Sequence, residues 1–244
     1  MFKPFKKDQM QDTCGFSLVE LAVVLAIIGL LAGGVLATSS YLKTAQQTTV
    51  INEGKYYLNA LKQFQAKYDG ALPGDMGNAS SYWSGAVSGN GNGTIESTGT
   101  IEIFLAFKHL QLSGLAAGQY SGTNGPAGPL DSVIGLNVPA LSMEGVTAWY
   151  LTPNAAGHIS ADADYFDGYY GTVLHIAKPS TGQLPRSGFL SPREAYELDQ
   201  KFDDGQPDKG WIRTMKSYTD CVGGTTSYLA TPTANACLLI LSAV

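Results

Sequence analysis

The sequence predicts an α+β fold in which a long N-terminal helix packs against a C-terminal globular head that contains an antiparallel sheet. Three observations support this prediction. An apolar run covers residues 16–37, apolar side chains recur at helical spacing over 50–68, and the remainder alternates between short apolar segments and loops rich in Gly, Asn and Pro. Apolar runs and 3.6-residue periodicity are typical of helices, whereas short aromatic and β-branched segments bounded by turn residues are typical of strands.

The apolar run between Phe16 and Ala37 contains one charged residue, Glu20. About 20 apolar residues in a helix are enough to cross the hydrocarbon core of a bilayer. Three lysines lie within residues 1–7, before the run. Because positive charge is retained on the cytoplasmic side, we expect a single transmembrane helix over 16–40 with a cytoplasmic N-terminal end. At this point an ordinary membrane anchor is the alternative explanation.

A charged glutamate inside an apolar run, as at Glu20, is energetically unfavourable if the run lies in a bilayer. A charged side chain near the middle of a bilayer costs roughly 2.5–3.5 kcal/mol on insertion scales. The simplest compensation is the positive end of the helix dipole, which stabilises an exposed acidic residue by about 0.3–1 kcal/mol. Interaction with the helix dipole is therefore the alternative explanation for a glutamate at this position.

Small residues form a stripe along the same predicted helix. Their spacings of three and four residues place them on one helix face, and Gly29 and Gly33 form a GxxxG motif. Small side chains let two membrane helices approach closely, although GxxxG alone is a weak indicator. The predicted packing face consists of Ala22, Ala26, Gly29, Gly33 and Ala37.

The helix is expected to continue beyond the apolar run as an amphipathic segment over 41–70. Its apolar face at helical spacing consists of Val50, Tyr57, Leu61, Phe64 and Tyr68. We therefore predict one helix over 16–68 that ends at the Asp69-Gly70 turn. Two helices with a hinge near Gly33-Gly34 or residues 38–40 are the alternative.

The head is expected to occupy residues 71–244. A capping box with proline at the first helical position, Ser-Pro-Arg-Glu, predicts a helix over 191–202. A second short helix is predicted over 100–112, and the Gly-, Asn- and Ser-rich residues 84–99 predict an exposed loop. Aromatic and β-branched residues predict strands over 145–151, 169–177 and 236–243.

Composition argues against two broad classes of function. The net charge is −5, and the only cluster of basic residues lies within residues 3–7, so nucleic-acid binding is not expected. His109, His158 and His175 are far apart in the sequence and belong to no recognised catalytic motif. We therefore expect a protein that is not an enzyme and requires no catalytic cofactor; an enzyme head on a membrane anchor is the less favoured alternative.

Residues 15–21, GFSLVEL, resemble the processing site of type IV prepilins and of the pseudopilins of type II secretion. The resemblance combines a short basic leader, a Gly-Phe junction, a glutamate at the fifth position after the junction and an apolar run. It covers about residues 1–50 and extends to the rest of the chain only through the expected architecture. That architecture is pilin-like: a helical spine, half of it transmembrane, on a head with an antiparallel sheet.

The resemblance implies that residues 1–15 are a leader peptide. In this family a prepilin peptidase cuts after the glycine, here Gly15, and the new amino group, here of Phe16, is methylated. The freed amine is positively charged and lies on the same helix as Glu20. The resemblance thus implies that Glu20 pairs with this amine or with that of a neighbouring subunit and sets the register of assembly. Breaking such a pair in apolar surroundings costs about 3–5 kcal/mol, because one charge loses its partner.

The implied function is that of a structural subunit, a minor one, of a type IV pilus or related filament, assembled through the N-terminal helix. Its implied partners are other pilin or pseudopilin subunits, prepilin peptidase and the assembly machinery of the bacterial inner membrane. The chain would lie in that membrane before assembly and in a periplasmic or cell-surface filament afterwards. A type II secretion pseudopilin and a tip adhesin, a binding module on a pilin anchor, are the alternatives.

The cysteines indicate the compartment. Cys14 would leave with the leader, so Cys221 and Cys237 remain in the head. Outside the cytoplasm these two can form a disulfide, and type IV pilins often carry a C-terminal region bounded by one. Two free buried thiols are the alternative.

An acidic turn lies near the C-terminal end of the head. Asp203, Asp204 and Asp208 are close enough in sequence to supply oxygen ligands to Ca²⁺, and some pseudopilins carry a calcium site in such a loop. The spacing does not match an EF-hand, which needs ligands at positions 1, 3, 5 and 12. A solvated turn after a helix is the alternative.

Overall fold

The computed structural model describes residues 15–97, 101–152, 158–159, 163–223, 226–230 and 235–243. Most of the predicted leader lies outside these residues, as do the side chains of residues 34–40 within the N-terminal helix. The chain divides into two compact units, Met1–Ala45 and Gln46–Val244.

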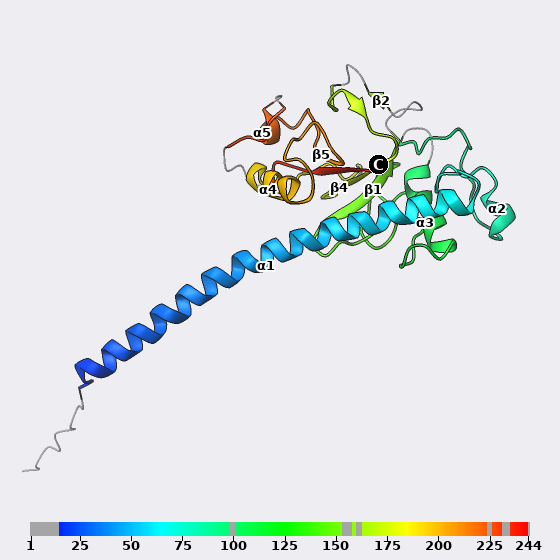
Figure 1. Cartoon of the computed structure of the whole chain (residues 1–244). Helices are drawn as coiled ribbons and strands as arrows, with labels where there is room; N and C mark the ends of the chain where they lie inside the picture. Colours follow the sequence, from blue (N-terminus) through cyan, green and yellow to red (C-terminus); the bar gives the residue numbers. More distant parts are fainter. Residues whose placement is uncertain are drawn as a thin grey trace, which may run out of the picture. The chain divides into compact units, whose positions relative to one another are not determined.

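A single helix, α1 (Leu18–Lys67), accounts for the predicted helical region (Figure 1). The prediction of one helix is therefore confirmed, and the alternative with a hinge near Gly33-Gly34 or residues 38–40 is wrong. The helix ends where Asp69 and Gly70 adopt positive φ angles of 53° and 81°. This left-handed backbone is incompatible with a continuing α-helix, and glycine adopts it at no steric cost.

In the first unit, the large apolar side chains of α1 are exposed. Phe16 and Leu18 are 84% and 87% exposed, and every large apolar side chain described from there to Leu31 is more than half exposed. A transmembrane span is expected over 16–40. In the part of the chain that the structure describes, no helix is long and apolar enough to cross a membrane.

In the second unit, α1 buries the amphipathic face that its sequence predicts. All five predicted side chains are at most 8% exposed and belong to the core: Val50, Tyr57, Leu61, Phe64 and Tyr68. Removing a large apolar side chain from water contributes roughly 1.5–3 kcal/mol, so this face is a major source of stability.

The same part of α1 lies directly on the main sheet. A Cβ at Gly54 would overlap the side chain of Leu241, so the glycine lets the helix backbone approach the sheet. The Tyr150 hydroxyl donates a hydrogen bond to the backbone carbonyl of Tyr57. Apolar packing and one buried polar contact therefore both join α1 to the sheet.

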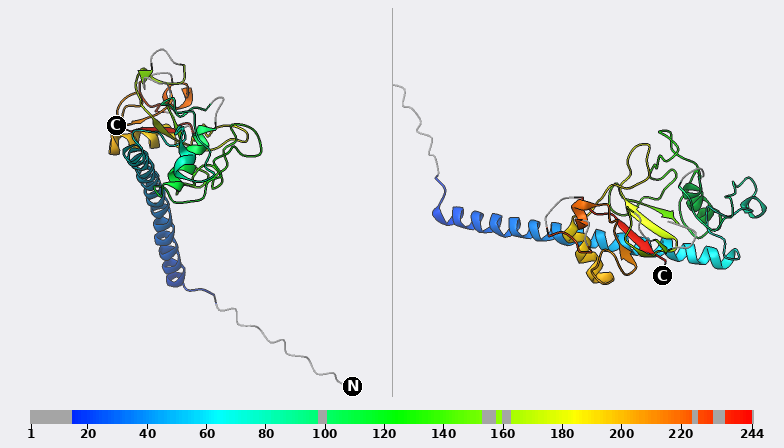
Figure 2. Two further views of the ribbon diagram at one scale, coloured as in Figure 1. Left: turned by 90° about the vertical axis from the view of Figure 1, so that its right-hand side faces the viewer. Right: turned by 90° about the horizontal axis from the view of Figure 1, so that it is seen from above.

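The main sheet is antiparallel with the strand order β1-β4-β6-β5 (Figure 2). The strand bounds are β1 Thr147–Leu151, β4 Val173–Ala177, β6 Leu239–Ser242 and β5 Ile212–Arg213. Trp149 pairs with His175, and His175 pairs with Ile240, so these three lie side by side across the sheet. A separate two-stranded sheet joins β2 (His158–Ile159) to β3 (Gly168–Tyr169).

The face of the sheet away from Leu241 is also covered. The indole of Trp149 stacks on the imidazole of His175 with ring centroids 4.4 Å apart, and its Nε1 donates to the carbonyl of Pro185 at 2.8 Å. The hydroxyl of Tyr165 lies 3.2 Å from Nε2 of His175. The segments that carry Tyr165 and Pro185 therefore cover this face, which explains why all residues of β1, β4 and β6 are buried.

Most long elements of the head match the sequence prediction. Helices α3 (Glu102–Leu112) and α4 (Pro192–Phe202) form as expected, and Ser191 makes the complete capping box. The predicted strand over 169–177 is wrong as a single element, because Gly171 at φ +59° separates β3 from β4. The short elements α2 (Ala79–Tyr82), α5 (Thr219–Val222), β2 and β5 are absent from the prediction, since two to four residues carry no periodicity.

The Gly- and Asn-rich stretch after α1 is held by buried carboxylates. Asp75, 3% exposed, accepts hydrogen bonds from the backbone N–H groups of Asn92 and Gly93. Glu102, 1% exposed, accepts from those of Asn90 and Glu96. The predicted exposed loop is thus a segment whose backbone is anchored to buried acidic side chains of its neighbours.

The two cysteines of the head form a disulfide. Cys221 lies in α5, Cys237 lies just before β6, and their Cα atoms are 5.1 Å apart. Both side chains are fully buried. The bond closes a loop that carries residues 226–230. The loop begins at α5 and ends just before β6, so the disulfide ties its two ends together.

Candidate functional site

The N-terminal segment before and at the start of α1 is the first candidate site. Gly15 and Phe16 precede the helix, and the phenyl ring of Phe16 is exposed. The hydroxyl of Ser17 accepts a hydrogen bond from the backbone N–H of Val19 at 3.2 Å, and the carboxylate of Glu20 accepts one from the backbone N–H of Ser17 at 2.9 Å. Glu20 thus lies beside the residue that follows the Gly-Phe junction.

This arrangement is a capping contact that our sequence analysis missed. Ser17 and Glu20 have the Ser-x-x-Glu spacing of a capping box, in which two otherwise unpaired N–H groups at the start of a helix are satisfied. The Ser17-x-x-Glu20 spacing is the sequence signal that indicates this contact. The carboxylate therefore has a local role in the intact chain.

The small-residue stripe is on the surface of the first unit. Ala22, Ala26, Gly29 and Gly33 are all exposed, and a Cβ at either glycine would meet no atom within 4 Å. Ala37, the fifth predicted member, lies outside the residues whose side chains are described. Within the described chain, therefore, no packing contact requires glycine at these two positions.

The acidic turn after α4 is the second candidate site. Ligand atoms of Asp199, Asp203 and Asp204 all lie within 4.8 Å of one another. The structure therefore groups two of the predicted residues with a third that the sequence analysis did not select, and Asp208 is outside this group. Asp199 was missed because it lies inside a helix, where it reads as part of the polar face, whereas its side chain is fully buried.

Asp199 connects α4 to two neighbouring loops. Its Oδ1 accepts a hydrogen bond from the backbone N–H of Gly205 at 3.2 Å, and its Oδ2 accepts one from the hydroxyl of Tyr228 at 2.9 Å. Burial raises the pKa of the Asp199 carboxyl to about 7; the nearby carboxylates of Asp204 and Asp203 act in the same direction, against the two hydrogen bonds. The Asp199 carboxyl is therefore close to half-ionised at neutral pH.

In each of the other two carboxylates of the group, one oxygen accepts a hydrogen bond from a backbone N–H group. Asp203 Oδ2 accepts from the N–H of Ile212 at 2.8 Å, and Asp204 Oδ1 accepts from the N–H of Gln206 at 2.8 Å. Among the described residues, the remaining oxygen of each carboxylate receives no hydrogen bond. Two free carboxylate oxygens and a buried third acid are a donor set that suits a hard cation such as Ca²⁺, which prefers oxygen ligands.

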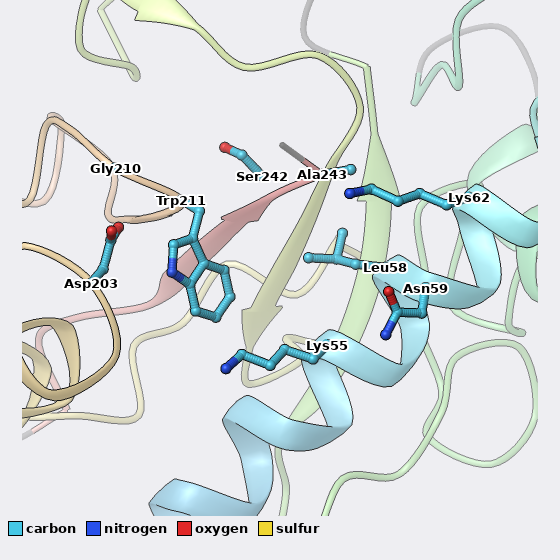
Figure 3. Close-up of a pocket in the computed structure, with 9 residues that line it drawn as sticks. All are labelled: Lys55, Leu58, Asn59, Lys62, Asp203, Gly210, Trp211, Ser242 and Ala243. Carbon is cyan, nitrogen blue, oxygen red and sulfur yellow. The ribbon is translucent and has the colours of Figure 1, made fainter.

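Asp203 also borders a cavity of about 510 Å³ between α1 and the β5–β6 side of the sheet (Figure 3). Its carboxylate points toward Gly210, where a Cβ would overlap it. Across the cavity, the Lys55 ammonium lies 4.9 Å from the ring centroid of Trp211 and 5.1 Å from that of Phe202. Contact with aromatic faces stabilises the cation by about 0.5–1 kcal/mol at exposed sites, so this lysine is part of the packing between α1 and the head.

Two histidines, His109 and His175, have buried side chains within the head. His109 Nδ1 accepts from the N–H of Gly74 at 3.0 Å, so its Nε2, 2.8 Å from the carbonyl of Val87, is the donor. Burial lowers the pKa of His109 and lowers that of His175 to about 3. Both imidazoles are therefore neutral at physiological pH and are engaged in packing or loop contacts.

The raised pKa of Asp199 predicts a specific pH dependence of stability. Because the folded carboxyl binds its proton more tightly than the unfolded one, its contribution is complete below about pH 4 and is lost as pH rises through about 7. We expect urea unfolding of the full chain to show this loss relative to Asp199→Asn, with no further divergence from about one pH unit above the folded pKa. Asp220→Asn, which alters an exposed carboxylate, is the control and should follow the wild type. Parallel profiles for the wild type and Asp199→Asn would contradict the prediction.

Comparison with known proteins gives one match. Residues 10–36 match the family model of the prokaryotic N-terminal methylation motif. The searches of curated proteins and of solved structures find no match to this chain. The matched segment contains the Gly15–Phe16 junction, Glu20 and all four exposed small residues. The chain thus carries at its N-terminus the signature of prepilin-type cleavage that is found in type IV pilins and pseudopilins.

Proposed function

We propose that this chain is a structural subunit, a minor one, of a type IV pilus or related filament. In this proposal prepilin peptidase removes residues 1–15, the amino group of Phe16 is methylated, and the mature chain assembles with other subunits through its N-terminal helix. The observation that carries the proposal is the methylation motif over 10–36, within which Glu20 lies next to the start of the helix. The size of the head favours a minor subunit, because major pilins tend to be smaller.

The position of Glu20 supports a role in assembly. Its carboxylate is 2.9 Å from the backbone nitrogen of Ser17, the residue after Phe16. Cleavage after Gly15 would convert the peptide nitrogen of Phe16 into a charged amine close to this carboxylate. In an array of parallel helices the same carboxylate can reach the amine of an adjacent subunit. A partner lost in apolar surroundings leaves an uncompensated charge at a cost of about 3–5 kcal/mol, so correct register is strongly favoured.

The exposed apolar side chains of the first unit support the proposal that lipid or protein, and not water, covers this surface. Exposed apolar surfaces of this extent usually mark contact with lipid or with another protein. We propose that lipid of the bacterial inner membrane covers the surface before assembly and neighbouring subunits cover it afterwards. The small residues at Gly29 and Gly33 would then permit close helix contacts, which explains glycine where the isolated chain does not need it. The large exposed side chains described there are Phe16, Leu18, Val19, Leu21, Val23, Val24, Leu25, Ile27, Ile28, Leu30 and Leu31.

A type II secretion pseudopilin is the alternative with the same N-terminal chemistry. Both kinds of subunit need the leader cleavage, the helix and the carboxylate, so the motif favours neither. Deletion of the chain distinguishes them: loss of protein secretion with intact surface fibres supports the pseudopilin, and loss of fibres or of their function supports the pilus.

Processing at the Gly15–Phe16 junction is directly testable. We expect mass spectrometry of the chain from cells that contain prepilin peptidase to give an N-terminus at Phe16 with the mass of one added methyl group. Gly15→Val should leave the leader attached. This variant is suitable because a Cβ at Gly15 meets no atom within 4 Å, so the substitution does not disturb the described fold. An intact leader on the wild-type chain in such cells would contradict the proposal.

Replacement of Glu20 separates its two roles. Glu20→Gln retains an oxygen that can accept from the Ser17 N–H but removes the charge, so we expect normal cleavage and membrane association with at least a tenfold loss of incorporation into filaments. Ser17→Ala is the matched control: it removes the hydroxyl that caps Val19 and keeps the carboxylate, and it should assemble. The amounts in sheared filaments and in membranes are compared by quantitative immunoblotting. Normal incorporation of Glu20→Gln would leave Glu20 with its capping role alone.

We further propose that the acidic turn binds Ca²⁺ through Asp199, Asp203 and Asp204, in place of the set with Asp208 expected from the sequence. The close approach of three carboxylates supports this proposal. Calcium at one hundred times its dissociation constant would stabilise the folded chain by about 2.7 kcal/mol. We expect millimolar Ca²⁺ to raise the melting temperature of the wild type and of Asp220→Asn but not of Asp204→Asn. The same temperature with and without calcium in the wild type would exclude the site.

A further inference from the structure

A second cavity lies between α4 and the loop closed by the disulfide, and its volume is about 720 Å³. Pockets for small ligands usually have volumes of 300–1,000 Å³. One wall is the outer face of α4, and the other consists of the turn at Gly205 and Gln206 and of residues 226–230. All of these residues belong to the unit Gln46–Val244.

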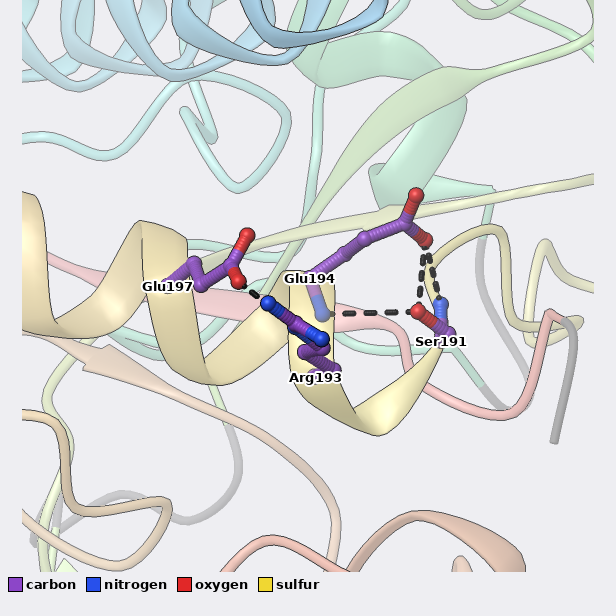
Figure 4. Close-up of polar contacts among 4 residues, drawn as sticks. All are labelled: Ser191, Arg193, Glu194 and Glu197. Carbon is purple, nitrogen blue, oxygen red and sulfur yellow. Dashed lines mark hydrogen bonds and ion pairs between the residues drawn. The ribbon is translucent and has the colours of Figure 1, made fainter. Parts of the chain in front are cut away.

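The wall on α4 presents four side chains at helical spacing: Arg193, Tyr196, Glu197 and Gln200. Arg193 Nε donates to Glu197 Oε1 at 2.8 Å, as Figure 4 shows beside the capping box of the same helix. This ion pair cancels the two charges of the wall. A charged ligand therefore finds no uncompensated partner on this side of the cavity.

Two tyrosine rings supply the aromatic surface. Tyr196 is 40% exposed, and its ring centroid lies 6.2 Å from that of Tyr228 in an edge-to-face arrangement with an interplanar angle of 64°. The rings come from different walls, so they meet across one end of the cavity. Aromatic faces attract the slightly positive C–H groups of a saturated ring, as they attract the edge of another aromatic ring.

Amide groups stand next to these rings. In the part of the chain that the structure describes, the side-chain amide of Gln200 makes no hydrogen bond, so two donors and one acceptor oxygen face solvent. The Gln206 amide oxygen accepts from Lys209 at 2.9 Å, which leaves its NH₂ group for other partners. The cavity therefore offers both donors and acceptors without net charge.

Hydrogen bonds to one side chain of α4 hold both loops that line the cavity. The buried Asp199 carboxylate accepts from Gly205 in one loop and from Tyr228 in the other, so both loops are held by a single side chain of α4. Gly205 has φ +75°, and a Cβ there would lie 3.3 Å from the Tyr196 ring, which places the turn directly against that ring. The disulfide closes the loop that carries Tyr228. A preformed site loses little conformational entropy when it binds a ligand.

We propose that this cavity is a binding site for a neutral saccharide. The C–H face of a pyranose ring would pack on Tyr196, and its hydroxyl groups would exchange hydrogen bonds with the Gln200 amide and the free oxygen of Glu197. The neutral wall disfavours phosphorylated or sulfated sugars. The proposal goes beyond the filament role and is independent of it, because no residue of the N-terminal segment takes part.

The test is saturation-transfer NMR on the full chain in a zwitterionic detergent without a sugar head group. The probes are glucose, galactose, mannose, N-acetylglucosamine, N-acetylgalactosamine and lactose. We expect at least one of them to receive saturation with a dissociation constant in the millimolar range. Tyr196→Ala and Gln200→Ala should each weaken that binding at least tenfold, and Tyr196→Phe should retain it.

Tyr169→Ala is the matched control, because Tyr169 is an exposed tyrosine of β3 that does not line the cavity, and it should bind like the wild type. The melting temperature of each variant establishes that it is folded. No transfer to any probe at 50 mM, or equal transfer in Tyr196→Ala and the wild type, would overturn the proposal. Loss of self-association in Tyr196→Ala without sugar binding by the wild type would instead assign the cavity to a second subunit.

Discussion

The contact between the amphipathic part of α1 and the main sheet is the constraint on which the head depends. Gly54 lets the helix backbone approach Leu241 of β6, and Tyr150 of β1 reaches the backbone of Tyr57 on the helix. β6 is a central strand, between β4 and β5. The apolar face of a sheet must be buried against another element, and the helix supplies this opposing layer of the core.

The loops of the head rely on a different interaction, the buried carboxylate that accepts backbone N–H groups. Asp75 and Glu102 hold the stretch after α1, Asp131 accepts from Ala127 and Gly182, and Asp199 holds the turn after α4. Regular strands and helices pair their own backbone groups, whereas long loops cannot. Because an unpaired buried N–H is costly, acidic side chains replace the missing ladder partners.

Two acidic residues far apart in the sequence, Glu20 and Asp199, act in related ways. Glu20 accepts an N–H at the start of α1, and Asp199 accepts an N–H and a hydroxyl between α4 and its neighbouring loops. In each case the local hydrogen bond is present in the isolated chain, and a further partner is proposed: an amine for Glu20 and a cation for Asp199. The local bond orients the carboxylate, so a partner that arrives later meets a group already in position.

The sequence by itself determined the elements whose signals are local. Periodicity defined α1 and its buried face, the capping box defined α4, and residues 15–21 identified the processing motif that the family comparison confirms. Only the tertiary structure decided that Asp199 joins Asp203 and Asp204, that the Gly- and Asn-rich loop is anchored to Asp75 and Glu102, and that two tyrosines meet across a cavity. Those contacts join residues that are far apart in the sequence and are brought together by folding. The sequence does not show whether a given carboxylate or aromatic ring faces solvent or a distant loop.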